Sequence, residues 1–286
     1  MKKAIFLYNP QSGKGRTDRK VEDICEVFSS YGYDIEPLQI DFDANPFDGH
    51  EQVELVVVAG GDGTINFAVN AMKRKGLDVA LGVIPAGTAN DFAGALGMSK
   101  NPLEAARQIA TGVEERVDCG RVNGLYFVNV FSFGIFTTTS QRTPDERKHR
   151  IGKLAYLVEG IKEFRSMHAV PLRVTADGEE FDFNSLMVLV FNGETAGGFP
   201  LARRASIKDG MFDCVLLEKR NPLLSTLSMG RYLLGGNPRE VRLVRARCIE
   251  ITSPVNEPTD VDGQPGADFP LHIECLPGEL RVLCQP

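Results

Sequence analysis

Residues 60–64 (GGDGT) combine the residue types that bind a phosphate group. They follow directly on Leu55–Ala59, an apolar run whose β-branched side chains predict a buried strand. Apolar residues recur at helical spacing from Ile65, so the glycines lie between a strand and a helix N-terminus, where amides and dipole favour an anion. Asp62 adds a carboxylate suited to positioning Mg²⁺ or a hydroxyl. Taken alone, the segment is also compatible with a tight turn that binds nothing.

A second segment, residues 9–15 (NPQSGKG), follows the predicted strand Ala4–Tyr8. Asn9 is able to hydrogen-bond a nucleotide or the neighbouring loop, the two glycines permit a tight turn, and Lys14 supplies a mobile positive charge. The segment does not match the GxxxxGK[ST] pattern of a Walker A loop. By itself it is more typical of an ordinary turn.

A third segment, residues 84–93 (IPAGTANDFA), follows another predicted strand. Thr88 is a candidate ligand for a phosphate or a ribose, whereas Asn90 or Asp91 could equally cap the helix that follows. Because the carboxyl ends of parallel strands share one edge of a sheet, we expect the three loops to converge. Amides for phosphate oxygens and the carboxylates of Asp62 and Asp91 for Mg²⁺ are what phosphoryl transfer needs.

The pattern of apolar and turn residues differs between the two halves of the chain, and it predicts the helices and strands that position these loops. The first 120 residues alternate strand and helix signals, which indicates crossover connections and a mostly parallel sheet. The predicted strands are Ala4–Tyr8, Asp34–Ile40, Leu55–Ala59 and Ala80–Ile84, and the predicted helices are Arg19–Tyr31, Ile65–Arg74 and Pro102–Ala110. After about Asp118, short strand-like runs separated by turn residues predict an antiparallel β-sandwich, interrupted by a helix at Lys153–Phe164. These runs are Tyr126–Phe131, Leu172–Thr175, Leu186–Phe191, Phe212–Leu217, Val241–Val244, Cys248–Thr252, Leu271–Cys275 and Leu280–Leu283.

Length, charge and cysteine content narrow the class of protein. A chain of 286 residues suits two domains, and a net charge of -6 argues against a nucleic-acid partner. The six cysteines form no CxxC pair, which favours a reduced cytoplasmic protein without a zinc site. The apolar start, Ala4–Tyr8, is too short for a secretion signal, and no run is long enough for a transmembrane segment. A homodimer remains open as an alternative to a monomer.

The three segments together, NPxSGKG, GGDGT and PxGTANDFA in this order, resemble the ATP-dependent diacylglycerol kinase catalytic-domain family. That family includes bacterial soluble lipid kinases, sphingosine kinases and ceramide kinases, and the resemblance covers essentially the whole chain. It implies an N-terminal Rossmann-like nucleotide-binding α/β domain, a C-terminal antiparallel β-sandwich, and an active site in the cleft between them. Applied to this sequence, it gives an ATP-binding domain over residues 1–120 and a lipid-acceptor domain over residues 121–286, whose last strand could return toward the first domain.

The resemblance also implies roles for individual residues. The residues expected to bind ATP are Asn9, Gly60, Gly61, Asp62, Gly63, Thr64, Thr88 and Asp91. Asp62 and Asp91 match carboxylates that handle the nucleotide and Mg²⁺, and Asp118 matches an acidic residue at the domain junction. A salt bridge with Arg116 or Arg121 is the alternative role for Asp118.

A magnesium loop in the second domain is a further implication of the resemblance. Residues 206–213 match the family's structural Mg²⁺ loop, in which the Asp209 carboxylate would join the backbone carbonyls of Ser206 and Met211. An all-oxygen ligand set suits Mg²⁺. Without the resemblance, Asp209-Gly210 predicts only a hairpin turn.

The chain departs from the family at two positions. The usual catalytic base is the Glu of a DGE motif, and position 264 is Gln, which cannot accept a proton near neutral pH. Asp262, on the same strand face if the segment is extended, or Asp118 could replace that base. General-base catalysis typically raises the reaction rate by about two to four orders of magnitude. Phe67 stands where many relatives carry Glu, and we expect it to pack.

These observations favour a lipid kinase that transfers the γ-phosphate of ATP to diacylglycerol or a related glycerolipid. A catalytically weak or silent nucleotide- or lipid-binding regulator is the alternative because of Gln264, and a kinase of a soluble acceptor is a third possibility. The enzyme would be cytoplasmic and peripheral at the inner membrane surface, where it meets its lipid substrate. Two basic clusters are candidates for membrane docking or for a solvated face: Arg142, Arg147, Lys148, His149, Arg150 and Lys153, and Arg239, Arg242, Arg245 and Arg247.

Overall fold

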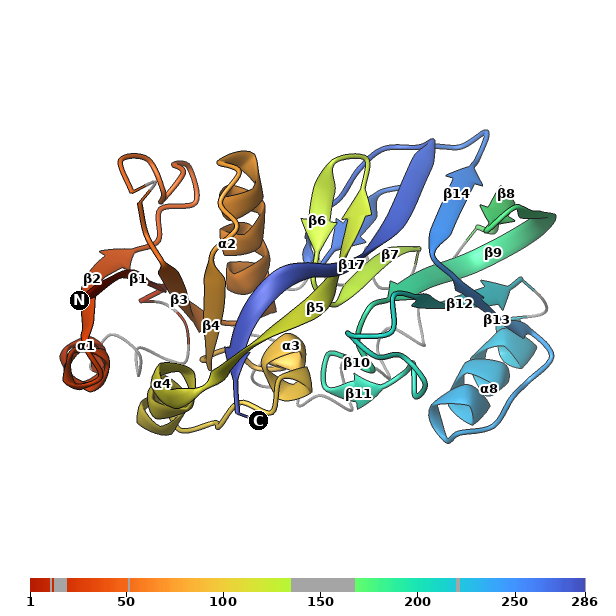
Figure 1. Cartoon of the computed structure of the whole chain (residues 1–286). Coiled ribbons are helices and arrows are strands. Elements are labelled where there is room, and N and C mark those ends of the chain that lie inside the picture. The colour runs from red at the N-terminus through yellow and green to blue at the C-terminus, as the bar shows by residue number, and fades with distance from the viewer. Residues whose placement is uncertain (11, 13–19, 51, 135–167, 220–221, 286) are drawn as a thin grey trace. The chain divides into compact units, whose positions relative to one another are not determined.

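A computed structural model describes residues 1–10, 12, 20–50, 52–134, 168–219 and 222–285, which divide into two compact units (Figure 1). The first unit comprises Met1–Asp118 and Gly278–Pro286, and the second comprises Cys119–Pro277. Two long strands, β5 (Val113–Val122) and β17 (Leu271–Cys284), contribute residues to both units. The chain therefore enters the second unit along one strand and returns to the first along another.

The first unit is built on a parallel sheet in the order β17-β4-β3-β1-β2. Its strands and helices are β1 (Lys2–Tyr8), α1 (Val21–Ser30), β2 (Tyr33–Gln39), β3 (Leu55–Gly60), α2 (Asp62–Arg74), β4 (Ala80–Pro85), α3 (Asp91–Ala95) and α4 (Pro102–Thr111). Every residue of β3 and β4 is buried, as expected for central strands covered on both faces. The helices α1, α2 and α4 contact β2, β3 and β4 respectively. The predicted parallel α/β domain is confirmed.

The sequence of residues 62–74 explains why helix α2 forms there. Its buried apolar side chains, Ile65, Ala68, Val69 and Met72, recur at intervals of three and four and form one face. Asp62 in the first turn and basic residues in the last turn complement the helix dipole. The helix therefore begins at the GGDGT segment, directly after β3.

The second unit is an antiparallel assembly, which confirms the predicted β-rich half. Strand order is β16-β15-β7-β9-β8-β14-β17, and β12 pairs with both β9 and β13. The elements are β6 (Leu125–Phe127), β7 (Val130–Gly134), β8 (Val170–Ala176), β9 (Glu179–Phe191), β10 (Thr195–Ala196), β11 (Phe199–Pro200), β12 (Phe212–Glu218), α8 (Pro222–Leu233), β13 (Val241–Ala246), β14 (Cys248–Thr252), β15 (Thr259–Val261) and β16 (Gln264–Pro265). Alternate residues of β9 enter different apolar clusters, with Val188 and Val190 in one and Met187, Leu189 and Phe191 in the other. Both faces of the second half of this strand, residues 185–191, are therefore packed.

Several elements differ from the sequence prediction, which contained no strand at β5 or at the short strands β10, β11, β15 and β16. Leu271–Cys275 and Leu280–Leu283 belong to one continuous strand, β17. Tyr126–Phe131 is divided between β6 and β7, because the backbone between them turns to bind a buried carboxylate described below. Helix α8 was not predicted, since it exposes leucines where a packed helix buries them. The predicted helix Lys153–Phe164 lies outside the described residues.

Candidate nucleotide site

Three loops meet at one edge of the first unit's sheet. β1, β3 and β4 run parallel, with Tyr8 beside Ala59 and Gly60 beside Pro85. The Asn9 amide donates to the Ala59 carbonyl over 3.3 Å, and the Ala86 amide donates to the Gly60 carbonyl over 2.9 Å. The convergence expected from the sequence is confirmed for the described parts of the loops.

Two glycines bring the second and third of these loops into backbone contact. A Cβ atom on Gly87 would stand 2.4 Å from the Cα of Gly61, and one on Gly61 would stand 3.1 Å from the Cα of Gly87. No Cβ tolerates the shorter distance, so Gly87 must be glycine, whereas a Cβ on Gly61 would require the facing backbone to yield by a few tenths of an ångström. Gly60 is packed as tightly, because a Cβ there would lie 2.4 Å from the Thr64 side chain. The glycines therefore join the loops as well as leaving amides open.

Asp62 links the same two loops through its carboxylate. It lies in the first turn of α2, and its Oδ1 accepts a hydrogen bond from the Phe92 amide over 3.2 Å. Asp91, the residue before Phe92, is 6% exposed. Two carboxylates predicted to handle Mg²⁺ thus belong to loops that are hydrogen-bonded to each other.

The third loop is held in shape by Asn90. Its Oδ1 accepts from the Gly87 amide over 2.7 Å, and its Nδ2 donates to the Gly87 carbonyl over 2.9 Å. Asn90 occupies the N-cap position of α3, but it has a left-handed backbone (φ 54°) and makes no side-chain capping bond to that helix. Thr88, inside this closed turn, is exposed. Sequence reasoning assigned no role to Gly87 and did not see that Asn90 closes the turn, although the Gly-x-x-Asn spacing is a signal for it.

The first loop is described only in part. Asn9 is half-buried at the end of β1, and its carbonyl accepts from the Ser12 amide over 3.0 Å. Gly13, Lys14 and Gly15 lie outside the described residues. The position of Asn9 beside the Ala59 carbonyl fits its predicted place next to the GGDGT segment.

Asp118 has a backbone partner within the first unit. It is 3% exposed, and its Oδ1 accepts from the Gly278 amide over 2.9 Å. Arg116 donates to the Gly278 carbonyl over 3.0 Å, and Arg121 donates to Glu274 over 2.7 Å. Asp118 therefore joins β5 to the returning strand β17.

Asp262 is engaged by the backbone of the second unit. Its Oδ2 accepts from the Val128 amide over 2.7 Å, and its Oδ1 accepts from Asn129 and Val130 over 3.0 and 2.8 Å. These three hydrogen bonds fix the carboxylate against the backbone of residues 128–130. Asp262 has a left-handed backbone (φ 49°) in the turn between β15 and β16.

Gln264 lies on β16 and is exposed. The expectation that Asp262 and Gln264 share one face of an extended strand is wrong, because the turn at Asp262 separates them. Gln264 carries no group that titrates near neutral pH, and the Asp262 carboxylate is occupied by three backbone amides. Of the four predicted catalytic residues, Asp62, Asp118 and Asp262 each accept a hydrogen bond from a backbone amide, and Gln264 has no titratable group.

The predicted magnesium loop of the second unit is rich in charge. Asp209 accepts from the Met211 amide over 3.1 Å and from Arg245 over 2.6 Å, and the Ser206 hydroxyl accepts from the Lys208 amide over 3.3 Å. Nearby, Oδ2 of Asp213 is buried and has no hydrogen-bond partner in the part of the chain that the structure describes. Burial raises the pKa of the Asp213 carboxyl, against the effect of Arg245. A buried carboxylate oxygen without a donor beside Asp209 is compatible with a hard cation.

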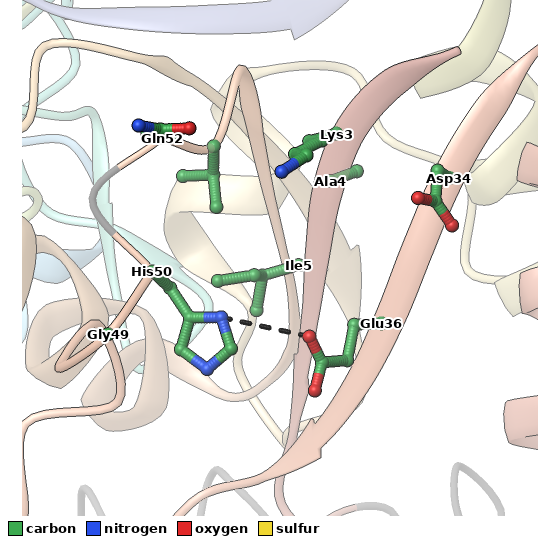
Figure 2. A pocket seen from close by; sticks show the side chains of 9 residues that line it. Lys3, Ala4, Ile5, Asp34, Glu36, Gly49, His50 and Gln52 are labelled. Atoms are coloured by element: carbon green, nitrogen blue, oxygen red, sulfur yellow. Dashed lines mark ion pairs between the residues drawn. The ribbon is translucent and has the colours of Figure 1, made fainter.

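The first unit also contains a surface cavity of about 370 Å³ at a different place (Figure 2). It is lined by Lys3, Ala4, Ile5, Asp34, Glu36, Gly49, His50, Gln52 and Val53. Figure 2 shows His50 pointing toward Glu36, 3.7 Å away. The lining residues come from the beginning of β1, from β2 and from the segment before β3, whereas the three loops follow the ends of β1, β3 and β4. The cavity is therefore separate from the candidate nucleotide site.

Phe67, the second departure from the family pattern, packs as expected. Its ring meets that of Phe42 edge to face, with the ring centres 4.9 Å apart. Among the described residues, no helix is long and apolar enough to cross a membrane. The six cysteines, all within the described residues, form no disulfide bond with one another, and four of them are buried.

Comparison with known proteins identifies relatives along the whole chain. A family model described as the diacylglycerol kinase catalytic domain matches residues 3–122, and one described as the YegS C-terminal NAD kinase beta sandwich-like domain matches residues 129–284. A diacylglycerol kinase of Bacillus subtilis (strain 168) is 31% identical over 293 residues, covering 99% of this chain and 96% of the relative. One from Staphylococcus aureus (strain MRSA252) is 31% identical over 290 residues, covering 98% and 92%. A crystal structure of a diacylglycerol kinase from Bacillus anthracis str. Sterne superimposes with a TM-score of 0.82 at 27% identity, covering 100% of this chain and 98% of that one.

Proposed function

The chain belongs to the diacylglycerol kinase catalytic-domain family, and on this basis we propose that it transfers the γ-phosphate of ATP to a lipid hydroxyl. The relatives' names favour diacylglycerol or a related glycerolipid as the acceptor. The observation that carries the proposal is the joining of two glycine loops, with Gly61 against Gly87 and Asp62 on the Phe92 amide. Such a junction keeps open amides and carboxylates together at a helix N-terminus, which suits a nucleotide polyphosphate.

In this proposal ATP lies against the amides of residues 60–64 and the hydroxyls of Thr64 and Thr88. Asp62 and Asp91 would hold Mg²⁺, which supplies charge neutralisation to the phosphate oxygens when bound. One or two carboxylates with substrate phosphates are an ordinary ligand set for this ion. The hydrogen bond from the Phe92 amide orients Asp62 before ATP arrives, so the carboxylate needs little rearrangement.

Catalysis without a strong base is chemically feasible for this reaction. Phosphoryl transfer through a loose transition state depends mainly on positioning and charge stabilisation. General-base assistance is worth about 10²- to 10⁴-fold, so its loss slows a kinase without abolishing it. We therefore expect slow turnover with Gln264, and we assign Asp118 and Asp262 to positioning because backbone amides engage both.

The experiment that tests this proposal measures transfer of label from radioactive ATP to lipid in mixed micelles with Mg²⁺. Asp62→Asn is the matched variant, because an amide oxygen still accepts from Phe92 while the charge is lost. Label in lipid from the natural protein, and its loss in Asp62→Asn with unchanged thermal stability, would support the proposal. No label across a broad lipid panel would refute it.

A second function, that of a catalytically silent nucleotide- or lipid-binding regulator, is favoured specifically by Gln264. The two functions separate in the same assay when Gln264→Glu is added. Label only from Gln264→Glu would mean that the ATP site is competent and that the natural protein lacks its base. Turnover by the natural protein would exclude the silent regulator.

Two subsidiary proposals complete this function. Mg²⁺ would also bind in the second unit at the Asp209 carboxylate with the carbonyls of Ser206 and Met211, as a structural ion. The enzyme would act in the cytoplasm at the inner membrane surface, where its acceptor resides.

A further inference from the structure

Helix α8 presents leucines to solvent. Leu224 and Leu227 are 48% and 67% exposed, and Leu234, directly after the last helical residue, is 90% exposed. Positions 224, 227, 231 and 234 follow one another at intervals of three and four, so they lie on one face of the helix. Arg231, the fourth member, is also exposed.

The inner side of α8 is unusually polar for a packed helix. Ser225 and Ser228 are buried, and the Ser228 hydroxyl donates to Glu240 over 2.7 Å. The Tyr232 hydroxyl donates to the Leu201 carbonyl, and Met229 packs into the apolar cluster beneath. A surface helix normally has the opposite arrangement, with leucines inside and hydroxyls outside. Packing among the described residues of this unit therefore does not explain the exposed leucines.

The neighbouring strand β13 adds to the same surface. Val241 packs with Met229 in the cluster under α8, and Leu243, two residues farther along the strand, points to that same side of the sheet. Leu243 is 54% exposed. Because β13 pairs only with β12 in the described sheet, α8 and β13 lie at its margin (Figure 1). A single extended surface can therefore contact α8 and β13 at the same time.

The charge of this region differs from that of the whole chain. Residues 222–247 contain five arginines and one acidic residue, Glu240, in a chain whose net charge is -6; of the five, Arg245 is paired with Asp209 and Arg242 lies over the Phe181 ring. Arg231 lies among the leucines and Arg239 is exposed in the connection to β13. Apolar side chains that insert below the headgroups, flanked by arginines that bind phosphates, are the features of an interfacial membrane-binding helix.

We propose that this leucine–arginine face, formed by Leu224, Leu227, Arg231, Leu234 and Leu243, docks the second unit on the surface of an anionic lipid bilayer. The proposal rests on the proposed function, since a lipid acceptor requires a bilayer, but bilayer binding is measured without ATP or turnover. Exposed leucines favour a bilayer over a nucleic acid, which would need arginines alone.

The first test is co-sedimentation of the full chain with vesicles containing phosphatidylglycerol, compared with vesicles of phosphatidylcholine. We expect binding to the anionic vesicles, weakened by salt, and a loss of about tenfold or more in Leu227→Asp/Leu234→Asp. Val255→Asp is the control, because Val255 is an exposed apolar residue outside this face. Equal pelleting of the double variant and the natural protein would overturn the proposal, as would preference for neutral vesicles.

A second test uses the absence of tryptophan from the chain. Leu234→Trp introduces a single reporter at the most exposed of these leucines, and its emission should shift to the blue with anionic vesicles. Val255→Trp should not shift. An unchanged Leu234→Trp spectrum in the presence of vesicles would contradict insertion. If Leu227→Asp/Leu234→Asp instead converts a dimer to a monomer in sedimentation analysis, the face is an interface between two copies and the proposal fails.

The kinase assay separates failure of this proposal from failure of the proposed function. The Leu227→Asp/Leu234→Asp variant should phosphorylate a short-chain, monomeric acceptor as fast as the natural protein does. With the same acceptor class embedded in anionic vesicles, the double variant should be at least about tenfold slower. Equal loss with both acceptors would show that the leucines do not act through the bilayer.

Discussion

Replacing Gly87 by alanine tests whether the contact between the two glycine loops creates the nucleotide site. The new Cβ would stand 2.4 Å from the Gly61 Cα and 2.9 Å from the Asn90 Oδ1, whereas ordinary contacts are 3.4–4 Å. The loops must therefore separate by about 1 Å, since backbone atoms in a packed site cannot yield as a flexible side chain does. Overpacking of this kind costs about 1–3 kcal/mol of stability.

The functional loss should exceed the loss of stability. A displacement of about 1 Å in a positioned site reduces catalysis by about 10²-fold, because amides and carboxylate no longer meet the same phosphate. The assays are calorimetric titration with ATP and Mg²⁺, and thermal unfolding without nucleotide. We expect Gly87→Ala to bind ATP at least about tenfold more weakly while remaining folded.

Gly94→Ala in α3 provides the matched control. A Cβ at Gly94 meets nothing within 4 Å, and alanine favours a helix by about 1 kcal/mol over glycine, so stability and ATP binding should be equal to or better than those of the natural protein. If Gly87→Ala binds ATP as tightly as Gly94→Ala does, the loop contact is not part of the nucleotide site, and the reasoning fails.

Three further predictions follow from individual contacts. Asp262→Asn should cost about 3 kcal/mol of unfolding free energy in urea titrations, because an amide group would face one of three backbone donors; a loss below 1 kcal/mol would contradict this. Arg281 donates two hydrogen bonds of 2.7 and 2.6 Å to Glu114 and lowers the pKa of that carboxyl group. The ion pair therefore stabilises the folded protein above the pKa of Glu114 in the unfolded chain, and this stabilisation is lost as the pH falls through the pKa of Glu114 in the folded protein. Because Glu114 is 41% exposed, Glu114→Gln should lower the stability by only about 0.5 kcal/mol at pH 7, and by nothing at a pH below both pKa values, as measured in pH-dependent melts. An equal loss of stability at both pH values would show that the charge of the ion pair does not cause the loss. Mg²⁺ at ten times its Kd should stabilise the nucleotide-free protein by about 1.4 kcal/mol, and Asp209→Asn should remove most of this gain in thermal melts; an unchanged gain would place the ion elsewhere.

The order of elements in the first unit was predictable because local periodicity reports burial. The apolar runs before residues 9, 60 and 86 are strands buried in the sheet, and their parallel pairing places the following loops at one edge. In the second unit, the same approach located most strands but failed for α8. That helix carries leucines outward, so its pattern does not describe a face packed against the core.

Contacts between residues distant in the sequence could not be predicted from it. Nothing near Gly87 indicates that the Gly61 backbone occupies the space of its missing side chain. Nothing near Asp262 indicates that the amides of residues 128–130 bind its carboxylate, so an extended strand was the simpler expectation.

The sequence by itself determined which residue types stand at the ends of which strands, because spacing along the chain sets both periodicity and motif. Only the tertiary structure decided what those residues do for one another, because packing brings together groups more than a hundred positions apart. Asp62 and Asp262 are both aspartates in glycine turns, yet one joins two loops of the candidate nucleotide site and the other anchors the backbone between two strands. Their difference arises from the donors that the fold places around each carboxylate.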